Sequence, residues 1–130
     1  MLKNERKSQG AIEFVIIFGA AMFFFTIFFL VIYSRVSETN QEKEAIIIKN
    51  LALSIQDEIN LAIKSTNGYY REFSVPETIS SQDYYINITD DMIYIKTEKN
   101  AVAYPVEEIQ GNIKKDVNVI KKENGEVRLN

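Results

Sequence analysis

The most constraining feature is an uncharged run of twenty residues, Phe14–Tyr33, which reads FVIIFGAAMFFFTIFFLVIY. At 1.5 Å per residue, a helix of this length covers about 30 Å, the thickness of the hydrocarbon core of a bilayer. A buried core helix is the alternative interpretation. The rest of the 130-residue chain is too short and too polar to surround a helix that is apolar on every side. The run therefore predicts a transmembrane helix.

A secretory signal peptide is the main rival interpretation of this run. Such a peptide ends in a small-residue A-x-A cleavage site, whereas residues 31–35 read VIYSR. The segment is therefore expected to be retained. Three basic residues precede the run, Lys3, Arg6 and Lys7, and only Arg35 follows it closely. This asymmetry predicts a cytoplasmic N-terminus and an external C-terminal part.

Composition excludes several classes of function. The chain has no Cys and no His, so disulfide frameworks, most zinc sites and His-activated nucleophiles are excluded. The five glycines are isolated from one another, so no phosphate-binding loop is present. Residues 35–130 carry 12 basic and 16 acidic side chains, and an acidic body gives no support to nucleic-acid binding. We therefore expect a protein that is not an enzyme and holds no cofactor.

Beyond the apolar run, the helical pattern continues but becomes one-sided. Residues 36–66 contain no glycine or proline, and apolar residues recur every three or four positions. The stripe consists of Ala45, Ile48, Ala52, Ile55, Ile59 and Ala62, widened by Ile47, Leu51 and Ile63, with Glu44, Lys49, Asp57 and Glu58 on other faces. Val36–Lys43 is polar all round, so a looser joint is one alternative to a continuous helix over about residues 9–64. Gly68 gives the stop signal.

Residues 67–130 show strand patterns instead. Six segments are typical of strands: Tyr70–Val75, Tyr84–Thr89, Met92–Thr97, Ala101–Val106, Asp116–Lys121 and Glu126–Leu129. Asp90-Asp91 and Asn124-Gly125 supply tight turns, and Asn-Gly favours a type I′ hairpin. Pro76 and Pro105 are expected at strand ends or edges. The sequence therefore predicts an α+β fold, in which a long N-terminal helix, transmembrane and then amphipathic, packs against a small C-terminal antiparallel sheet of four to six strands.

The segment that leads into the apolar run carries a motif, K-S-Q-G-A-I-E-F over residues 7–14. Together with the basic leader, the long helix and the terminal sheet, it resembles archaeal type IV pilin-like proteins with a class III signal peptide. That family has a basic and a small residue followed by Q-x-S-x-E-F. The matching residues are Lys7, Ser8, Gln9, Glu13 and Phe14. Two departures exchange one small residue for another, with Ser8 replacing Gly or Ala and Ala11 replacing the serine.

The resemblance implies that a prepilin peptidase cuts the chain on the cytoplasmic side, between Ser8 and Gln9. The resulting parts are a leader (1–8), a transmembrane assembly helix (9–35), an amphipathic helix (36–66) and an antiparallel head domain (67–130). The resemblance also implies that Glu13, the fifth residue after the cut, serves assembly by pairing with the freed α-amino group of an adjacent subunit. In the alternative interpretation, Glu13 only reaches the membrane interface beside Lys7.

The expected function is a structural subunit of an archaeal type IV pilus-like surface filament, which stays in the cell membrane until it joins copies of itself or other pilin-like subunits. Two alternatives remain open: an accessory pseudopilin outside the main fibre, and a single-pass anchored module whose head binds an external ligand. Asn87-Ile88-Thr89 is the only N-x-S/T sequon, so Asn87 is a candidate glycosylation site on an external head. Asp90-Asp91 is interpreted as a solvated turn rather than a Ca²⁺ site, and no metal is expected.

Overall fold

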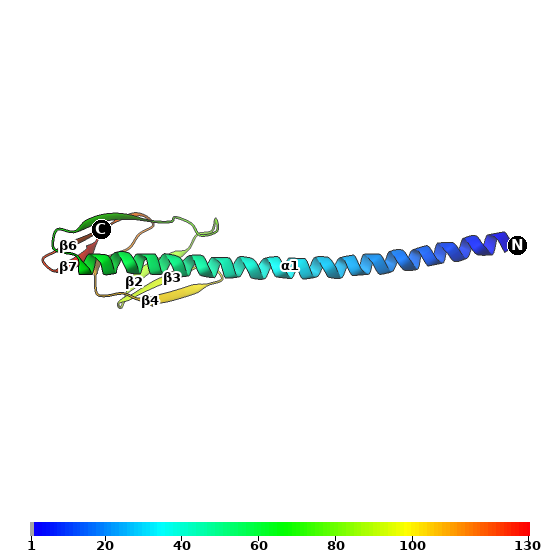
Figure 1. The fold of residues 1–130 in the computed structure, drawn as a ribbon, viewed down its shortest axis with the longest axis horizontal. Coiled ribbons are helices and arrows are strands. Elements are labelled where there is room, and N and C mark those ends of the chain that lie inside the picture. Colours follow the sequence, from blue (N-terminus) through cyan, green and yellow to red (C-terminus); the bar gives the residue numbers. More distant parts are fainter. Residues whose placement is uncertain (1) are drawn as a thin grey trace. The chain divides into compact units, whose positions relative to one another are not determined.

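The computed structural model describes the backbone of residues 2–130 and the side chains from Lys7 onward. Helix α1 (Leu2–Lys64) contains the apolar run and the amphipathic stretch without interruption (Figure 1). Val36–Lys43 is helical throughout, so the prediction of one continuous helix is confirmed. The stretch contains neither glycine nor proline, the two residues that most disfavour a helix interior. The chain divides into two compact units, Met1–Asn40 and Gln41–Asn130, which are described separately.

The second unit contains seven strands within the described residues. They are β1 (Tyr70–Val75), β2 (Tyr85–Thr89), β3 (Met92–Lys96), β4 (Ala101–Pro105), β5 (Gln110–Gly111), β6 (Asp116–Glu123) and β7 (Glu126–Leu129). The six predicted strands are confirmed, with shifts at some ends. The α+β fold is confirmed as well. β5 was not predicted, because a strand of two residues has no periodicity to read.

The strands form two sheets, so the prediction of a single sheet is wrong. One sheet has the order β1-β6-β7-β5 and the other has the order β2-β3-β4. All pairings are antiparallel except β5 with β7, which is parallel. Pro76 follows β1 and Pro105 ends β4, as predicted. Proline donates no backbone hydrogen bond, which suits positions at the ends of strands, and both prolines lie where the chain passes from one sheet to the other.

Two hairpins use two-residue turns with both central residues at positive φ. Asp90 and Asp91 have φ values of 51° and 57°, and the register brings Thr89 opposite Met92. Asn124 and Gly125 have φ values of 53° and 83°, between Glu123 and Glu126. Type I′ turns require positive φ at both central positions, so the hairpin predicted from Asn-Gly is confirmed.

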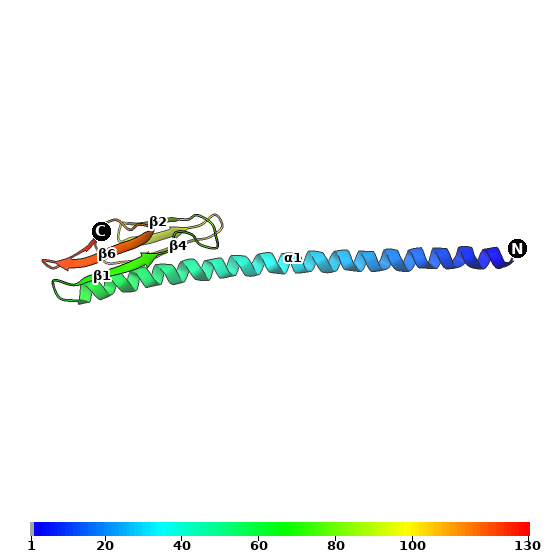
Figure 2. The ribbon, with the colours of Figure 1, turned by 90° about the horizontal axis from the view of Figure 1, so that it is seen from above.

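The core of the second unit forms between one face of α1 and the two sheets. Figure 2 shows β1 and β6 alongside the last turns of the helix. The buried helix residues are Ile48, Ala52, Ile55, Ile59 and Ala62, and they form one cluster with Val75, Ile93, Ile95, Ile120 and Leu129. The predicted stripe is therefore confirmed from Ile48 to Ala62, whereas Ala45, its predicted first member, is only half-buried and lies outside the cluster. Ile47 is an exception at 42% exposed, because it lies at the edge of the stripe.

Glu44 corrects the prediction for the polar faces of the helix. The sequence analysis assigned it to a face away from the sheets, yet it is only 7% exposed. It lies one turn before Ile48 on the buried stripe, where the next apolar position would fall. Its carboxylate is buried because the loop between β3 and β4 supplies hydrogen-bond donors, and a buried charge requires such partners.

Candidate assembly site and head clusters

The first unit exposes nearly all of its apolar surface. The large hydrophobic side chains between Ile12 and Val36 are 43–79% exposed. Soluble monomers rarely carry a continuous apolar surface of this extent. Within the described residues, this is the one helix long and apolar enough to cross a bilayer. Its composition makes it a candidate membrane span.

The residues of the predicted processing and assembly site all lie on α1. Ser8, Gln9 and Glu13 are exposed, and the Ser8–Gln9 bond lies within the helix. The Gln9 side-chain amide donates a hydrogen bond to the Glu13 carboxylate, with 3.3 Å between Nε2 and Oε1. Among the described side chains, no basic group lies within 4.0 Å of that carboxylate, so Lys7 does not pair with it. The structure thus brings Gln9 and Glu13 together.

Glu13 is the only charged residue between Lys7 and Arg35. The aromatic surface begins directly after it, where the Phe14 and Phe18 rings stack with centroids 6.0 Å apart. Further along, the Thr26 hydroxyl donates to the Met22 carbonyl at 2.9 Å, which satisfies this polar group within the helix. Among the described residues, the Glu13 carboxylate accepts one side-chain hydrogen bond, from Gln9, and has no cationic partner. A carboxylate next to so apolar a surface is costly unless it is paired, which makes Glu13 a candidate functional residue.

The Glu44 cluster fastens the β3–β4 loop to α1. The Thr97 hydroxyl and the Asn100 amide both donate to the Glu44 carboxylate, the second at 3.2 Å. The Asn100 backbone N–H in turn donates to the Thr97 hydroxyl at 3.0 Å. The hydrogen bonds from Thr97 and Asn100 lower the pKa of Glu44, and the positive charge of Lys99 adds to this effect against the cost of burial.

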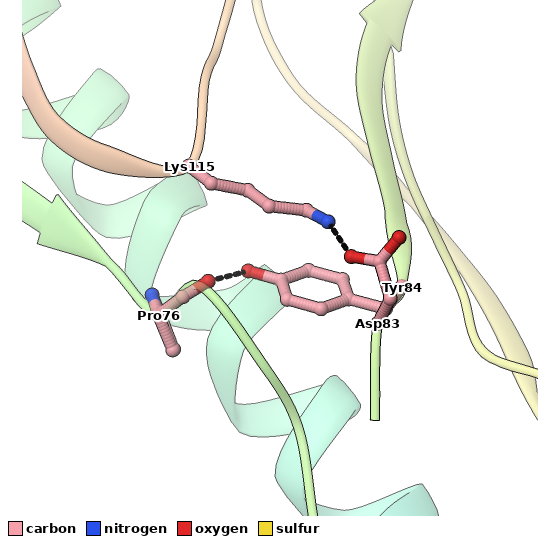
Figure 3. A network of polar contacts seen from close by, with 4 residues as sticks. All are labelled: Pro76, Asp83, Tyr84 and Lys115. Atoms are coloured by element: carbon pink, nitrogen blue, oxygen red, sulfur yellow. Dashed lines mark hydrogen bonds and ion pairs between the residues drawn. The ribbon is translucent and has the colours of Figure 1, made fainter. Parts of the chain in front are cut away.

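A second cluster joins the loop after β1 to the loop before β6 (Figure 3). The buried Tyr84 hydroxyl donates to the Pro76 carbonyl. The Lys115 ammonium lies 4.6 Å from the centre of the Tyr84 ring and also pairs with Asp83. The hydrogen bond from Lys115 and its positive charge lower the pKa of Asp83. These contacts hold two irregular segments in fixed positions.

An open depression, here called the basic depression, lies beside the second cluster. Its lining combines three lysines, one aspartate, one threonine, two tyrosines and two isoleucines. The lining residues are Asp83, Tyr84, Tyr85, Ile86, Lys96, Thr97, Ile113, Lys114 and Lys115. The sequence analysis missed this feature, because its residues come from three separate segments and no single segment carries a motif.

Asn87 lies in the middle of β2, opposite Tyr94 of β3. Its side chain is half-buried, and its Oδ1 atom accepts a hydrogen bond from the Ile88 backbone N–H at 2.9 Å. Asn87 therefore lies within a strand and not at an exposed strand end. Modification of this residue remains a prediction.

Metal-binding residues do not gather in the described part of the chain, where no group of three acidic side chains is arranged to hold an ion. Comparisons with protein-family models, with curated proteins and with solved structures gave no significant match to this chain.

Proposed function

We propose that this chain is a structural subunit of a surface filament of the archaeal type IV pilus-like kind. In this proposal a prepilin peptidase removes residues 1–8, and the mature subunits assemble through the apolar part of α1. The observation that carries the proposal is a helix with exposed apolar side chains and a single carboxylate, Glu13, at the start of the apolar surface. The K-S-Q-G-A-I-E-F motif places that carboxylate five residues into the mature chain.

In this proposal the apolar part of α1 moves from contact with lipid to contact with the helices of other subunits. In the membrane, lipid covers its exposed side chains, and in a filament the helices of other subunits take the place of lipid. Glu13 is compatible with both states. Near the N-terminus of the mature helix, the macrodipole stabilises a carboxylate by about 0.3–1 kcal/mol. In the filament, the α-amino group of a neighbouring Gln9 supplies a counter-charge, which offsets desolvation.

The second unit is the external head in this proposal. The basic leader and the acidic residues beyond Arg35 support this orientation. The head has its own core, built from the second half of α1 and the two sheets, and it stays folded while the apolar helix changes its surroundings.

The mature N-terminus tests the proposal. Filaments sheared from cells that express the chain should contain a protein whose N-terminal sequence and intact mass begin at Gln9 with a free α-amino group. A cyclised Gln9 would support the position of the cut but would contradict the pairing with Glu13, because the cyclised residue carries no charge. Ser8→Leu should accumulate uncut in the membrane, because a bulky side chain replaces the small residue of the motif. The matched control Ser37→Leu should be cut normally. A mature chain that starts at Met1 or after Ser34 would contradict the proposal, and a start at Ala11 would contradict the register.

A further inference from the structure

The three-stranded sheet carries opposite charges at its two ends. The β2–β3 turn presents Asp90 and Asp91, both exposed. At the other end of β3, Lys96 lines the basic depression together with Lys114 and Lys115. The five steps along the strand from Asp91 to Lys96 span about 17 Å. The two charged ends are therefore separate surfaces of one head.

The two-residue turn between β2 and β3 consists of Asp90 and Asp91, although the geometry of such a turn does not require charged residues. The hairpin between β6 and β7 makes the same kind of turn with Asn124-Gly125. Among the described side chains, no basic group lies within 4.0 Å of Asp90 or Asp91. Two adjacent carboxylates repel each other, and a turn alone is made at lower cost by Asn-Gly. We infer that Asp90 and Asp91 are placed in this turn for their negative charge and not for the turn conformation.

The basic end has positive charge that the head does not neutralise. Asp83 pairs with Lys115, but no carboxylate among the described side chains lies within 4.0 Å of the Lys96 or Lys114 ammonium. Tyr85, which faces Lys96 across the ladder, is 58% exposed. The surrounding unit is acidic overall, with 11 basic and 15 acidic residues between 41 and 130. A basic depression on such a surface fits an anionic partner.

The line between the two ends follows the helix axis of the second unit. At the basic end, Thr97 hydrogen-bonds to Glu44 of α1. At the acidic end, Pro105 pairs with Met92 beside the turn and accepts a hydrogen bond from Gln56 of α1, at 2.5 Å. Residues 44 and 56 are about 18 Å apart along a helix. A copy displaced along this axis brings its acidic turn toward the basic depression of the next copy.

We propose that heads contact one another head to tail, with the Asp90-Asp91 turn of one subunit seated in the basic depression of the next. This inference rests on the proposed function and names a contact within the filament. Different surfaces meet at this contact, so it repeats without closing a two-fold dimer and suits an open helical assembly. An anionic polysaccharide would use the basic depression alone and would leave the acidic turn without a role.

Disulfide trapping tests this contact, because the chain has no cysteine of its own. Thr89→Cys and Tyr85→Cys place one thiol beside each charged end without changing a charge. They lie four residues apart on β2, about 14 Å, so a disulfide within one head is excluded. Oxidised filaments of the double variant should give a ladder of dimers, trimers and longer products on a denaturing gel. Each single variant should stay monomeric, and the control pair Thr89→Cys with Tyr70→Cys should give no ladder.

Reversing the charges at the two ends tests whether the acidic turn of a second copy is what binds the basic depression. Lys96→Glu with Lys114→Glu, or Asp90→Lys with Asp91→Lys, should each lower filament yield about tenfold or more, since like charges then meet at the contact. All four changes in one chain should restore the yield. Loss without restoration would overturn the contact and point to another anion at the lysines. Filaments that give no ladder would also overturn it, whereas an unaltered chain that forms no filaments would contradict the proposed function itself.

Discussion

At Gly111 the backbone leaves no space for a side chain. This residue of β5 has a φ of +96°, and a Cβ atom added to it would lie 1.9 Å from the Leu129 carbonyl oxygen. The parallel pairing of β5 with β7 brings the two backbones this close. Gly125 also has positive φ, at +83°, but an added Cβ atom would meet nothing within 4 Å. An alanine at Gly125 would meet only the strain of positive φ, whereas an alanine at Gly111 would meet that strain and a steric clash as well.

Gly111→Ala should lower the free energy of unfolding of the head by more than the 1–2 kcal/mol or so that positive φ alone costs an L-residue. Gly125→Ala, the matched control, should cost only about that amount. Denaturant unfolding of the full chain in detergent micelles measures both, followed by tyrosine fluorescence because six of the seven tyrosines lie beyond residue 65. Equal losses for the two variants would contradict the close approach at Leu129.

The Glu44 cluster makes head stability depend on pH in a defined direction. The pKa of Glu44 in the folded head lies below its ordinary value of 4.5. Its stabilising contribution is therefore complete above that value and is lost as the pH falls through the lowered pKa. Glu44→Gln should lower the free energy of unfolding by about 1–2 kcal/mol at pH 7, since it removes a charge from the hydrogen bonds with Thr97 and Asn100.

The difference between Glu44→Gln and the unaltered chain should shrink as the pH falls below 4.5, because Glu44 is then protonated first in the unfolded chain and, as the pH passes the lowered pKa, in the folded head as well. The control Glu42→Gln changes an exposed neighbour and should have little effect at any pH. The free energy of unfolding of the unaltered chain and of both variants, measured at pH 7 and at pH 3, tests this prediction. A Glu44→Gln effect that stays constant over this range would show that its charge is not what matters.

At the scale of elements, the end of α1 is held by a lysine from the far end of the sequence. The Lys122 ammonium, on β6, donates to the carbonyls of Ile63 and Ser65 at 2.5 and 2.9 Å. These carbonyls have no partner within the helix, and a cation near a helix C-terminus is also favoured by the macrodipole. Strand β6 thus pairs with β1 and β7 in the sheet and also supplies the lysine that caps the helix.

Lys122→Met should destabilise the last turn of α1 by about 1–2 kcal/mol, while the apolar stem of the side chain is kept. Hydrogen exchange should speed up for the amides of residues 61–68. Lys121→Met is the matched control, because Lys121 pairs only with Glu123 at the surface and such pairs contribute little. Unchanged exchange in Lys122→Met would mean that water caps these carbonyls equally well.

Local patterns predicted the elements better than their assembly. The spacing of Ile48, Ile55 and Ile59 was sufficient to identify the buried face, and Asn124-Gly125 was sufficient to identify a turn. The division into two sheets follows from the pairing of β1 with β6, which are separated by more than 40 residues, and no local pattern carries that information. Glu44 was misassigned because its burial depends on donors in a loop 53 residues away.

The candidate functional residues also fall into those that a local motif identified and those that only the fold brings together. The motif identified Gln9 and Glu13 separately, and the helical period brings residues four apart together, but the hydrogen bond between these two side chains was not predicted. The basic depression draws on residues 83–86, 96–97 and 113–115, which only the folded head brings together. Surface features of this kind require the structure.

At the scale of the whole molecule, one chain has two parts that need different surroundings. The first unit exposes apolar side chains that lipid or other helices must cover, whereas the second has a closed core and a charged surface. In the proposed filament, assembly through the first unit would leave the second unit free to make its own contacts. In the proposed filament, Glu13 is the charge that requires a partner when the apolar helices come together.

The most direct test of this account is the filament yield of Glu13→Ala. The variant should insert into the membrane normally and should still be cut before Gln9, since removing a charge makes insertion easier. Its assembly should fail, because a buried α-amino group without its partner costs about 3–5 kcal/mol. Glu13→Gln should fail as well, and the exposed Glu38→Ala should assemble normally. The account predicts few filaments and an excess of cleaved monomer in the membrane, and a normal filament yield from Glu13→Ala would contradict it.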